Sequence, residues 1–339
     1  MKKFWANINV PIFALAPMED VTDTAFRELV VRLSAPGALH VVYTEFTSVD
    51  GMNHPAGKKR VGERLVVSPS ERKILQQKGI RLVAQIWGKN PEIFHKVAKE
   101  ITEQYQFDGL DINMGCPVKK VVKNGCCSAL IGQPELALEI INAVKEATDL
   151  PVSVKTRTGI RVHETERWIS QLLKASPAAI ILHGRRQTQQ SDGLADWNEI
   201  QKAAELRNEF TPSTRILGNG DIFSYQQGLE YSAKYGVDGV MIGRGIFHNP
   251  WFFNPAQEEK TVEEKLDKLV LHTRLFESVW GETKNFNILK RFFKIYTQNF
   301  SEAARLRAQL MEARNYRDVY ERTEDFLTRK GARHFAELL

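Results

Sequence analysis

The sequence predicts an α/β protein, a (β/α)8 TIM barrel followed by a smaller C-terminal all-helical domain. Two observations support this fold class. Short apolar, β-branched runs recur eight times between residues 11 and 245, each closed by Gly, Pro or polar residues. Most of the gaps between them have helical patterning. Such alternation favours a parallel barrel, with a doubly wound open sheet as the alternative. We expect the barrel to occupy residues 1–255 and the helical domain residues 256–339.

The expected strands follow one another along the first three quarters of the chain. Among the intervening segments, 91–104 has Pro91 placed for a first helical turn, and 134–147 has apolar residues at helical spacing. In order, the eight strands span 11–18, 41–46, 81–88, 109–115, 151–157, 178–185, 215–222 and 239–245.

The region beyond about residue 260 also has helical patterning. Segment 286–296 places Arg291 opposite an apolar face, with Lys290 and Lys294 on the flank. We expect a helix here whose apolar face is formed by Phe286, Leu289, Phe293 and Tyr296.

Composition excludes several classes of protein. Three cysteines in 339 residues do not suggest a disulfide framework, and without a CxxC or HExxH motif we expect no structural metal. The basic N-terminus is a poor signal peptide because Asn7, Asn9 and Pro11 interrupt its apolar run, and no segment approaches the ~20 apolar residues of a membrane span. We expect a cytoplasmic monomer with no membrane partner.

Positive charge is concentrated in two segments. The formal net charge is +6 and the pI is about 9.1. Segments 58–81 and 284–317 each contain eight Lys and Arg against two Glu. Such clustering indicates either a polyanionic partner or a solvated basic face.

Polar or glycine residues close every expected strand. In a parallel barrel the catalytic residues gather at the carboxyl ends of the strands. The two last strands end in Gly218-Asn219-Gly220 and Gly243-Arg244-Gly245, where barrel enzymes frequently bind phosphate. The chain has no GxGxxG, and residues 51–58 miss the Walker spacing by one residue, which argues against a Rossmann site and a P-loop. The other strand ends carry Pro17, Met18, Glu45, Gln85, Asn113, Cys116, Lys155, Arg157, His183, Arg185 and Asp221.

These motifs resemble those of the tRNA-dihydrouridine synthases. The resemblance covers the whole barrel and extends into the helical tail. It implies an FMN-dependent oxidoreductase that reduces the C5–C6 double bond of uridines in tRNA, with NADPH as the expected reductant. The motifs are APMEDVTDTAFR (16–27), INMGCPVKK (112–120), SVKTRTG (153–159), LHGR (182–185), NGDI (219–222) and MIGRG (241–245).

The resemblance also implies roles for individual residues. Cys116 would protonate C5 from the face opposite the hydride, and a thiol with an ordinary pKa near ~8.5 is mostly protonated at neutral pH. Asn113, Lys155 and Arg157 would orient the uracil. The FMN site would comprise Pro17, Met18 and Glu19 beneath the isoalloxazine, Gln85, Lys155 and His183 around the ring and ribityl chain, and Asn219, Gly220, Asp221, Gly243 and Arg244 at the phosphate end.

Three features depart from the family pattern. Arg186 follows the HGR motif where the family usually has Thr, and 52–80 is an unusually basic loop that either contacts RNA or is solvated. Cys126 and Cys127 stand where the family usually has Gly or Ala, and we interpret them as structural or incidental.

A uridine in folded RNA has to be turned out of its stack, so contacts elsewhere on the RNA must offset that cost. We expect the helical domain to bind tRNA through Lys290, Arg291, Lys294, Arg305 and Arg307, the alternative being a barrel-capping bundle with a solvated basic face. Two other functions remain open: an FMN barrel reductase of a small molecule, such as a dihydroorotate dehydrogenase or ene-reductase, and a non-catalytic RNA-binding barrel. The sequence leaves open which uridine is reduced and whether NADPH or NADH is preferred.

Overall fold

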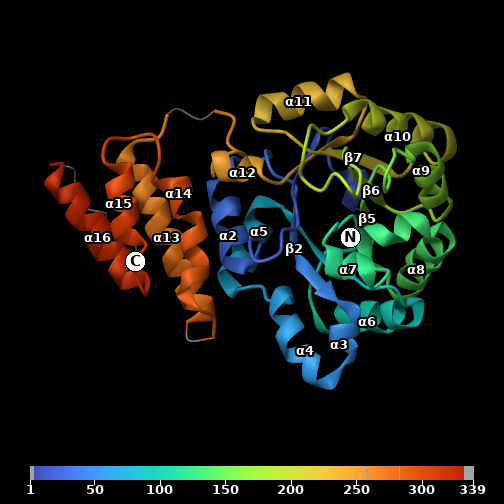
Figure 1. The fold of residues 1–339 in the computed structure, drawn as a ribbon, viewed down its shortest axis with the longest axis horizontal. Coiled ribbons are helices and arrows are strands. Elements are labelled where there is room, and N and C mark those ends of the chain that lie inside the picture. The colour runs from blue at the N-terminus through green and yellow to red at the C-terminus, as the bar shows by residue number, and fades with distance from the viewer. Residues whose placement is uncertain (1–3, 257–258, 282, 332–339) are drawn as a thin grey trace.

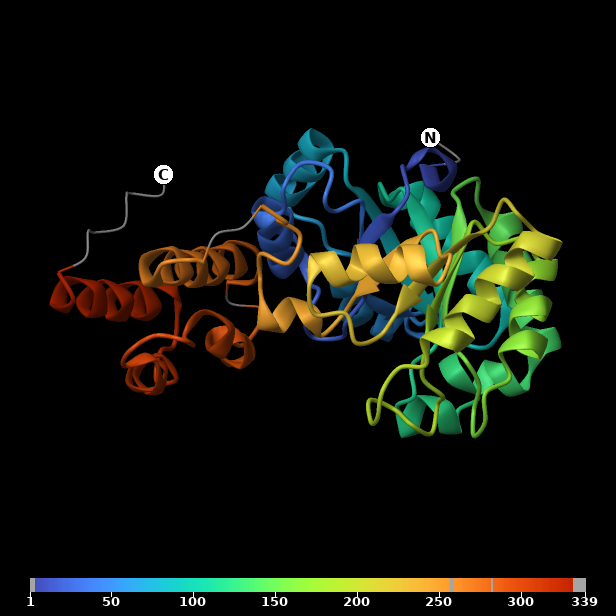
Figure 2. The same ribbon diagram turned by 90° about the horizontal axis from the view of Figure 1, so that it is seen from above.

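The computed structural model describes residues 4–256, 259–281 and 283–331, and it contains a closed barrel of eight parallel strands with a helical lobe at one side (Figures 1 and 2). Each strand pairs with the next along the chain, and β8 pairs with β1 to close the barrel. The predicted (β/α)8 class is therefore confirmed. The strands are β1 (Ile12–Leu15), β2 (Val41–Ser48), β3 (Arg81–Trp87), β4 (Gly109–Met114), β5 (Val152–Arg157), β6 (Ala179–His183), β7 (Arg215–Asn219) and β8 (Gly239–Ile242).

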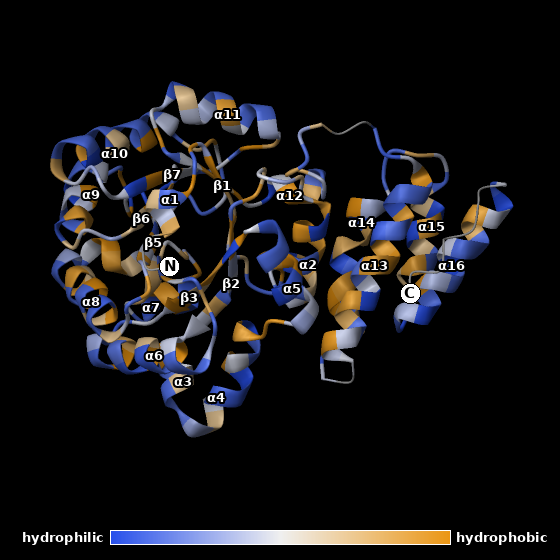
Figure 3. Cartoon of the chain, turned by 180° about the vertical axis from the view of Figure 1, so that it is seen from behind, coloured by the Kyte–Doolittle hydropathy of each residue, from blue (hydrophilic) through white to orange (hydrophobic). Residues whose placement is uncertain are grey.

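Amphipathic helices cover the outside of the barrel, and Figure 3 shows hydrophobic and hydrophilic residues alternating along helices such as α8 and α10. The two helices expected at 91–104 and 134–147 are present with those bounds. Asn90 caps α6 by accepting hydrogen bonds from the amides of Glu92 and Ile93, and Pro91 opens its first turn. The covering helices are α2 (Thr24–Leu33), α5 (Pro69–Lys78), α6 (Pro91–Gln104), α8 (Pro134–Ala147), α9 (Thr165–Lys174), α10 (Trp197–Phe210) and α11 (Tyr225–Lys234).

The amino-terminal end of the barrel is filled by apolar side chains. Phe4 and Trp5 of α1 (Phe4–Asn7) pack there against inward-facing strand residues such as Tyr43, Ile181 and Leu217. All five side chains are at most 4% exposed. Because this end is packed, the strand residues available to a ligand are those at the carboxyl ends.

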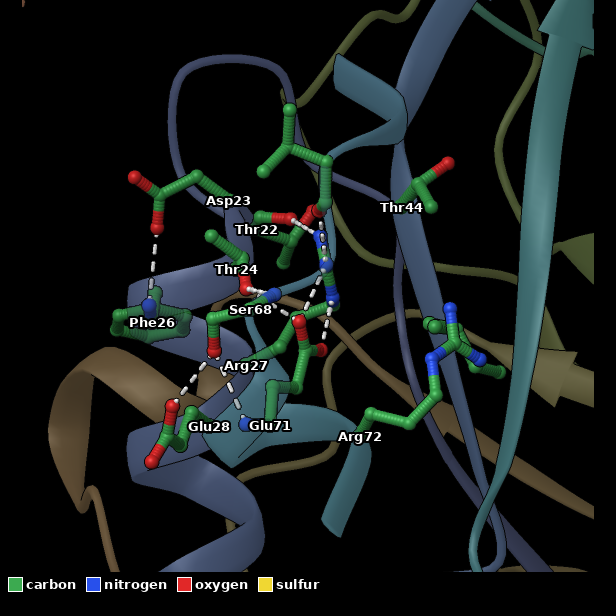
Figure 4. A network of polar contacts seen from close by, with 12 residues as sticks. Thr22, Asp23, Thr24, Phe26, Arg27, Glu28, Thr44, Ser68, Glu71 and Arg72 are labelled. Carbon is green, nitrogen blue, oxygen red and sulfur yellow. Dashed lines mark hydrogen bonds and ion pairs between the residues drawn. The ribbon is translucent and has the colours of Figure 1, made fainter. Parts of the chain in front are cut away.

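The expectation of a loop over 52–80 is wrong. The segment forms α3 (Val49–Asn53), α4 (Pro55–Gly62), the 3-10 turn η1 (Glu63–Leu65) and α5. Arg27 of α2 makes a fully buried bidentate ion pair with Glu71 of α5, with N···O distances of 2.6 and 2.8 Å (Figure 4). Several cations of the basic segment 58–81 bond within the protein, namely Lys58 to Glu100, Lys78 to the carbonyls of Val31 and Ser34, and Arg81 to Asp108.

The C-terminal region is helical, but 286–296 is not one α-helix as expected. It forms a 3-10 segment, η3 (Phe286–Phe292), followed by the short helix α14 (Phe293–Tyr296). A 3-10 turn aligns side chains three residues apart, so Phe286, Leu289 and Phe292 share one side. Phe293 and Tyr296 are buried beyond them, so the segment buries more than one face. The other described elements here are α13 (Val262–Trp280), α15 (Ala303–Leu310) and α16 (Tyr316–Arg329). Residues 257–258, 282 and 332–339 of the expected domain lie outside the described residues.

The helical region is attached to the barrel through α2. The ring of Phe26 stacks on Phe292 at 5.3 Å between centroids and contacts His272 at 5.6 Å. The indole N–H of Trp280 donates to the carboxylate of Asp23 at 2.8 Å. Because Asp23 caps the start of α2, just after β1, this interface places the helical region beside the carboxyl end of the barrel.

None of the described helices is long and apolar enough to cross a membrane. Within the same residues, no three His, Cys, Asp or Glu side chains gather in a group that could hold a metal ion.

Candidate active site

Alternation along the strands directs the polar residues of neighbouring strands into the mouth of the barrel. Asn113 is the register partner of Lys155, Arg157 that of His183, and His183 that of Asn219. Because residues two apart on a strand share a face, Lys155 and Arg157 lie on the same face of β5, and these residues form two successive polar levels above the apolar interior.

One cavity at this mouth brings together most of the residues expected to bind the cofactor. It also contains Arg185, Ser191 and the backbone of Gly245. Nine of the eleven expected residues line it: Pro17, Met18, Lys155, His183, Asn219, Gly220, Asp221, Gly243 and Arg244.

The other two residues, Glu19 and Gln85, do not line the cavity. Glu19 turns away to an ion pair with Arg64, whose Nε lies 2.8 Å from its carboxylate. Gln85 is fully buried, donates to Asp111 at 2.7 Å and accepts from Asn113 at 3.0 Å. Gln85 therefore fixes the orientation of the Asn113 side-chain amide.

Glycine is required in the loops after β7 and β8. Gly220 has φ of +124°, and a Cβ built on it would lie 2.6 Å from the Cβ of Ala195. A Cβ on Gly245 would lie 2.3 Å from the carbonyl oxygen of Ile222. The two loops thus pack closely against their neighbours while their backbone lines the cavity, the arrangement that suits an anion.

A charged cluster lies on the β7–β8 side of this cavity. The guanidinium of Arg185, only 2% exposed, donates to both carboxylate oxygens of Asp221 at 2.7 and 2.6 Å, and Arg244 contacts the same carboxylate at 3.1 Å. Burial raises the pKa of Asp221, but the hydrogen bonds from Arg185 and the Ala195 amide, with both positive charges, hold it below its usual value. Asp221 therefore positions two arginines instead of contacting an anion itself.

Arg185 also determines the protonation of His183. Its Nη1 lies 3.1 Å from Nε2 of His183, and because a guanidinium only donates, Nε2 accepts. Burial and the nearby positive charges of Lys155, Arg157 and Arg185 lower the pKa of His183 well below its ordinary value. The imidazole is neutral, and its remaining N–H is on Nδ1.

Lys155 lies between the two halves of the mouth. Its ammonium donates to Asn219 at 3.1 Å, and Asn219 in turn donates to the carbonyl of Met241 at 2.9 Å. Burial and the charge of Arg157 lower the pKa of Lys155 to about 8, against the opposing effect of the buried carboxylate of Asp111. The side chain is thus still mainly cationic at neutral pH.

The loop carrying Cys116 is fixed by side chains from β4 and β5. Asn113 accepts hydrogen bonds from the amides of Gly115 and Cys116, both at 3.0 Å. Arg157 donates from Nε to the carbonyl of Gly115 at 2.7 Å and from Nη1 to the carbonyls of Arg186 and Gln190. Both residues, expected to orient a substrate, therefore use most of their hydrogen-bonding groups to shape the loop.

The expectation of an ordinary thiol at Cys116 is wrong. Its pKa falls to about 7, first because the thiol of Cys127 hydrogen-bonds to it. Burial acts in the opposite direction, while the Val118 amide and the charges of Arg157 and Lys155 lower the pKa further. Thiol and thiolate are both well populated at neutral pH.

Arg186, the departure noted in the HGR motif, extends away from this loop. Its Nη1 donates to the carbonyl of Arg161 at 2.8 Å, while its own carbonyl accepts from Arg157. The residue thus helps to connect the loops after β5 and β6.

The residues expected to bind RNA lie at two places on the helical region. Arg291 and Lys294 are exposed and border a cavity with Val21 and Phe292, next to the loop after β1, whereas Lys290 is half-buried. We refer to Lys290, Arg291 and Lys294 as the tail cations. Arg305 pairs with Glu302, and Arg307 donates to the carbonyl of Thr297 at 2.7 Å, so both have contacts within the helical region.

Sequence reasoning missed three features of this site. The LHGR motif identified Arg185 as a residue at a strand end but gave no sign that it binds Asp221 and His183. Asp111 is fully buried and accepts a hydrogen bond from Gln85, whereas the sequence shows it only as part of an expected strand. The contact between Cys127 and Cys116 depends on how the intervening loop folds back, which no local pattern indicates.

Comparison with known proteins identifies relatives over the whole length. A family model described as dihydrouridine synthase matches residues 14–330. A Staphylococcus epidermidis protein named probable tRNA-dihydrouridine synthase is 41% identical over 334 residues, which cover 98% of each chain. A Bacillus subtilis protein named probable tRNA-dihydrouridine synthase 2 is 42% identical over 327 residues, covering 96% of this chain and 97% of that one.

Solved structures resemble the barrel at low sequence identity. Morphinone reductase superposes with a TM-score of 0.50 at 12% identity, over 73% of this chain and 86% of that one. A 6-hydroxypseudooxynicotine amine oxidase from Pseudomonas geniculata gives 0.52 at 11%, over 74% of this chain and 49% of that one. These structures support the barrel fold alone. The family model and the sequence relatives show that the chain belongs to the dihydrouridine synthase family.

Proposed function

We propose that this protein is a tRNA-dihydrouridine synthase that reduces the C5–C6 double bond of uridines in tRNA, with FMN at the barrel mouth, NADPH as reductant and Cys116 as the proton donor. The observation that carries the proposal is the arrangement of the mouth. Close-packed glycine loops line the β7–β8 side, a thiol of lowered pKa follows β4, and Lys155 of β5 donates to Asn219 at the end of β7. The relatives named as tRNA-dihydrouridine synthases support the choice of substrate.

The residues present fit FMN. The close-packed backbone of Gly220 and Gly245, with Arg244 at their edge, would hold the phosphate. Neutral His183 would donate from Nδ1, and Lys155 would lie near the ring system, where a cation favours the reduced, anionic flavin. When bound and reduced, FMN supplies the hydride that is added to C6 of the uracil.

The protein's own residues perform the other half of the reduction. Asn113 and Arg157 hold the backbone of the Cys116 loop, and the Cys116 thiol lies within electrostatic reach of Lys155. Cys116 donates its proton to C5, and the charges of Arg157 and Lys155 stabilise the thiolate that remains. An acid with a pKa near the working pH combines a useful protonated fraction with a strong tendency to transfer the proton.

Binding of tRNA would place the helical region against the RNA backbone. Two of the tail cations, Arg291 and Lys294, border a cavity with Val21 of the loop after β1, so RNA held by them would be adjacent to the mouth. An inserted uridine must be unstacked at a cost of a few kcal/mol, which backbone contacts of this kind offset. We propose that residues 256–339 form this tRNA-binding domain and residues 1–255 the FMN-binding catalytic domain of a cytoplasmic monomer.

The test is reduction of tRNA by the FMN-loaded protein. Undermodified tRNA, free uridine and orotate are each incubated with NADPH, and the products are analysed by nucleotide-resolved mass spectrometry. We expect a gain of two hydrogens on uridine only within tRNA. Reduction of orotate or free uridine, with no change in tRNA, would favour a small-molecule reductase instead. Failure to retain FMN and to oxidise NADPH would favour a non-catalytic RNA-binding protein.

A further inference from the structure

A fully buried carboxylate lies one level below the polar residues of the mouth. Asp111 stands between Leu110 and Ile112 in β4, and its register partners are Gln85 on β3 and Ser153 on β5. Its Oδ2 accepts from Nε2 of Gln85 at 2.7 Å, and its Oδ1 accepts from Oγ of Ser153 at 2.6 Å. Because burying a charged group without partners is costly, these two hydrogen bonds are what allow a carboxylate at this position.

A chain of hydrogen bonds connects Asp111 to the backbone of Cys116. Asn113, two residues further along β4 and on the same face, donates from Nδ2 to Oε1 of Gln85 at 3.0 Å. Its Oδ1 accepts from the backbone amides of Gly115 and Cys116, both at 3.0 Å. The three side chains of this chain are at most 6% exposed, so solvent has little access to the bonds between them.

The direction of each hydrogen bond follows from the backbone end of the chain. A backbone N–H can only donate, so the atom of Asn113 that faces the Gly115 and Cys116 amides is its oxygen. The side-chain nitrogen of Asn113 is then directed to Gln85 and requires an acceptor, which is the Gln85 oxygen. The nitrogen of Gln85 is in turn directed to Asp111, where only an acceptor can complete the chain. A carboxylate meets this requirement because both of its oxygens accept.

The ionisation of Asp111 agrees with this assignment. Burial raises its pKa to about 6, while the hydrogen bonds from Ser153 and Gln85 and the charge of Lys155 act in the opposite direction. The carboxylate is therefore mostly ionised at neutral pH. At lower pH, Oδ1 can take the proton and donate it to the Ser153 hydroxyl, while Oδ2 still accepts from Gln85.

We propose that Asp111 is a positioning residue for Cys116. Its carboxylate sets the direction of the Gln85 and Asn113 amides, which hold the Cys116 backbone in the place from which the thiol protonates the uracil. This inference rests on the proposed function. Without an acceptor at position 111, the Gln85 nitrogen is either left unpaired in a buried site or turned against the nitrogen of Asn113. In both cases the Asn113 amide no longer holds the Cys116 loop firmly, and a displacement of about 1 Å near a reacting group can lower a rate by a factor of about 100.

The experiment uses substitutions that treat the acceptor differently. Asp111→Leu has a similar shape and no acceptor, whereas Asp111→Asn loses the charge but can turn its oxygen to Gln85 and its nitrogen to the Ser153 hydroxyl. Asp111→Leu combined with Gln85→Leu removes both partners of the first link, so a folding defect in the single Leu variant does not decide the result. Ser153→Ala is the matched control, because it removes a hydrogen bond of similar length to the same carboxylate outside the chain to Cys116.

Single-turnover reduction of undermodified tRNA is measured over a range of tRNA concentrations with prereduced proteins matched in FMN content by flavin absorbance. The assay is run at about pH 6.5, below the pKa of Lys155, which is about 8, so that removing the charge of Asp111 leaves Lys155 mainly cationic. We expect the rate at saturating tRNA to fall at least about tenfold in the single and double Leu variants, with the tRNA concentration for half-maximal rate changed less than about twofold. Asp111→Asn and Ser153→Ala should keep the rate within about threefold of the unsubstituted protein, although both unfold at a lower temperature.

The single and double Leu variants should lose the same factor, because the two side chains act through one chain. An unchanged rate in the double Leu variant, or an equally large loss in Asp111→Asn or Ser153→Ala, would overturn the role of Asp111 as the acceptor and leave the proposed function in place. Absence of tRNA reduction by the unsubstituted protein would overturn the proposed function and, with it, this inference.

Discussion

Replacing Asp221 by Asn tests whether the ion pairs of Asp221 with Arg185 and Arg244 stabilise the fold at the barrel mouth. Its carboxylate is the counter-charge of Arg185, and it also accepts from the Ala195 amide at 2.8 Å. Asn keeps the size of the side chain and one acceptor oxygen but removes the charge. The guanidinium of Arg185, 2% exposed, would then be left buried beside a neutral group.

The expected loss of stability follows from this burial. Removing one partner of a buried ion pair costs about 3–5 kcal/mol. Asp221 is 15% exposed and Asn can still accept one hydrogen bond, so we expect the free energy of unfolding to fall by about 2–4 kcal/mol. As a matched control, Glu103→Gln removes the partner of Lys99 in an exposed pair whose side chains are 60% and 62% accessible, and should cost less than about 0.5 kcal/mol.

The effect of pH has a defined sign. Because the pKa of Asp221 is lower in the folded protein than its ordinary value of 3.8, its charge contributes stability that is complete above that value. This contribution is lost as the pH falls through the lower, folded pKa. The difference in free energy of unfolding between the unsubstituted protein and Asp221→Asn should therefore be constant at neutral pH and shrink below about pH 4.

Urea unfolding followed by circular dichroism measures this difference for the Asp221→Asn and Glu103→Gln variants side by side. A loss below about 1 kcal/mol for Asp221→Asn, or one no larger than that of Glu103→Gln, would refute the reasoning that a buried guanidinium depends on this carboxylate.

Three further predictions concern the cofactor and the RNA. Gly220→Ala, which sets a Cβ against Ala195, should lower the free energy of unfolding by about 1–3 kcal/mol and weaken FMN binding in a fluorescence titration. Gly236→Ala is the control: Gly236 also has a positive φ, of +62°, but its added Cβ would have no neighbouring atom within 4 Å, so FMN binding should be unchanged. Lys155→Met should lower the reduction potential of bound FMN by about 20–40 mV in a spectroelectrochemical titration, and an unchanged potential would argue against a cation near the ring. Reversing the charge of all three tail cations should weaken tRNA binding at least about tenfold and reduce its salt dependence, and equal affinity would exclude them as the RNA contact. The control reverses the charge of three exposed lysines on barrel helices, Lys99, Lys174 and Lys202.

Local sequence signals were sufficient for much of the fold. The strands are predicted because each ends where apolar residues give way to polar ones. Pro91 marks the first turn of α6, and apolar residues recur at helical spacing in α8. The same reasoning could have found α5, since Ser68 caps it by accepting from the Glu71 amide and Gly79 ends it with φ of +67°.

Other features could not be obtained from local patterns. Segment 286–296 contains a 3-10 turn whose last residue, Phe292, packs against Phe26 of α2, a contact between residues far apart in the sequence. Arg185 and Asp221 lie in different loops, so their ion pair depends on how β6 and β7 are placed side by side. The pKa of Cys116 likewise depends on Cys127, Arg157 and Lys155, which the fold brings together.

The central claim is that Cys116 supplies the proton for uridine reduction at this mouth. The most direct measurement is single-turnover reduction of undermodified tRNA by the FMN-loaded, prereduced protein, comparing the unsubstituted chain with Cys116→Ala. We predict a rate about 10²–10⁴-fold lower in the variant, with FMN binding and flavin reduction by NADPH unchanged, because only the proton donor is removed. Equal rates of dihydrouridine formation in the two proteins would contradict the account.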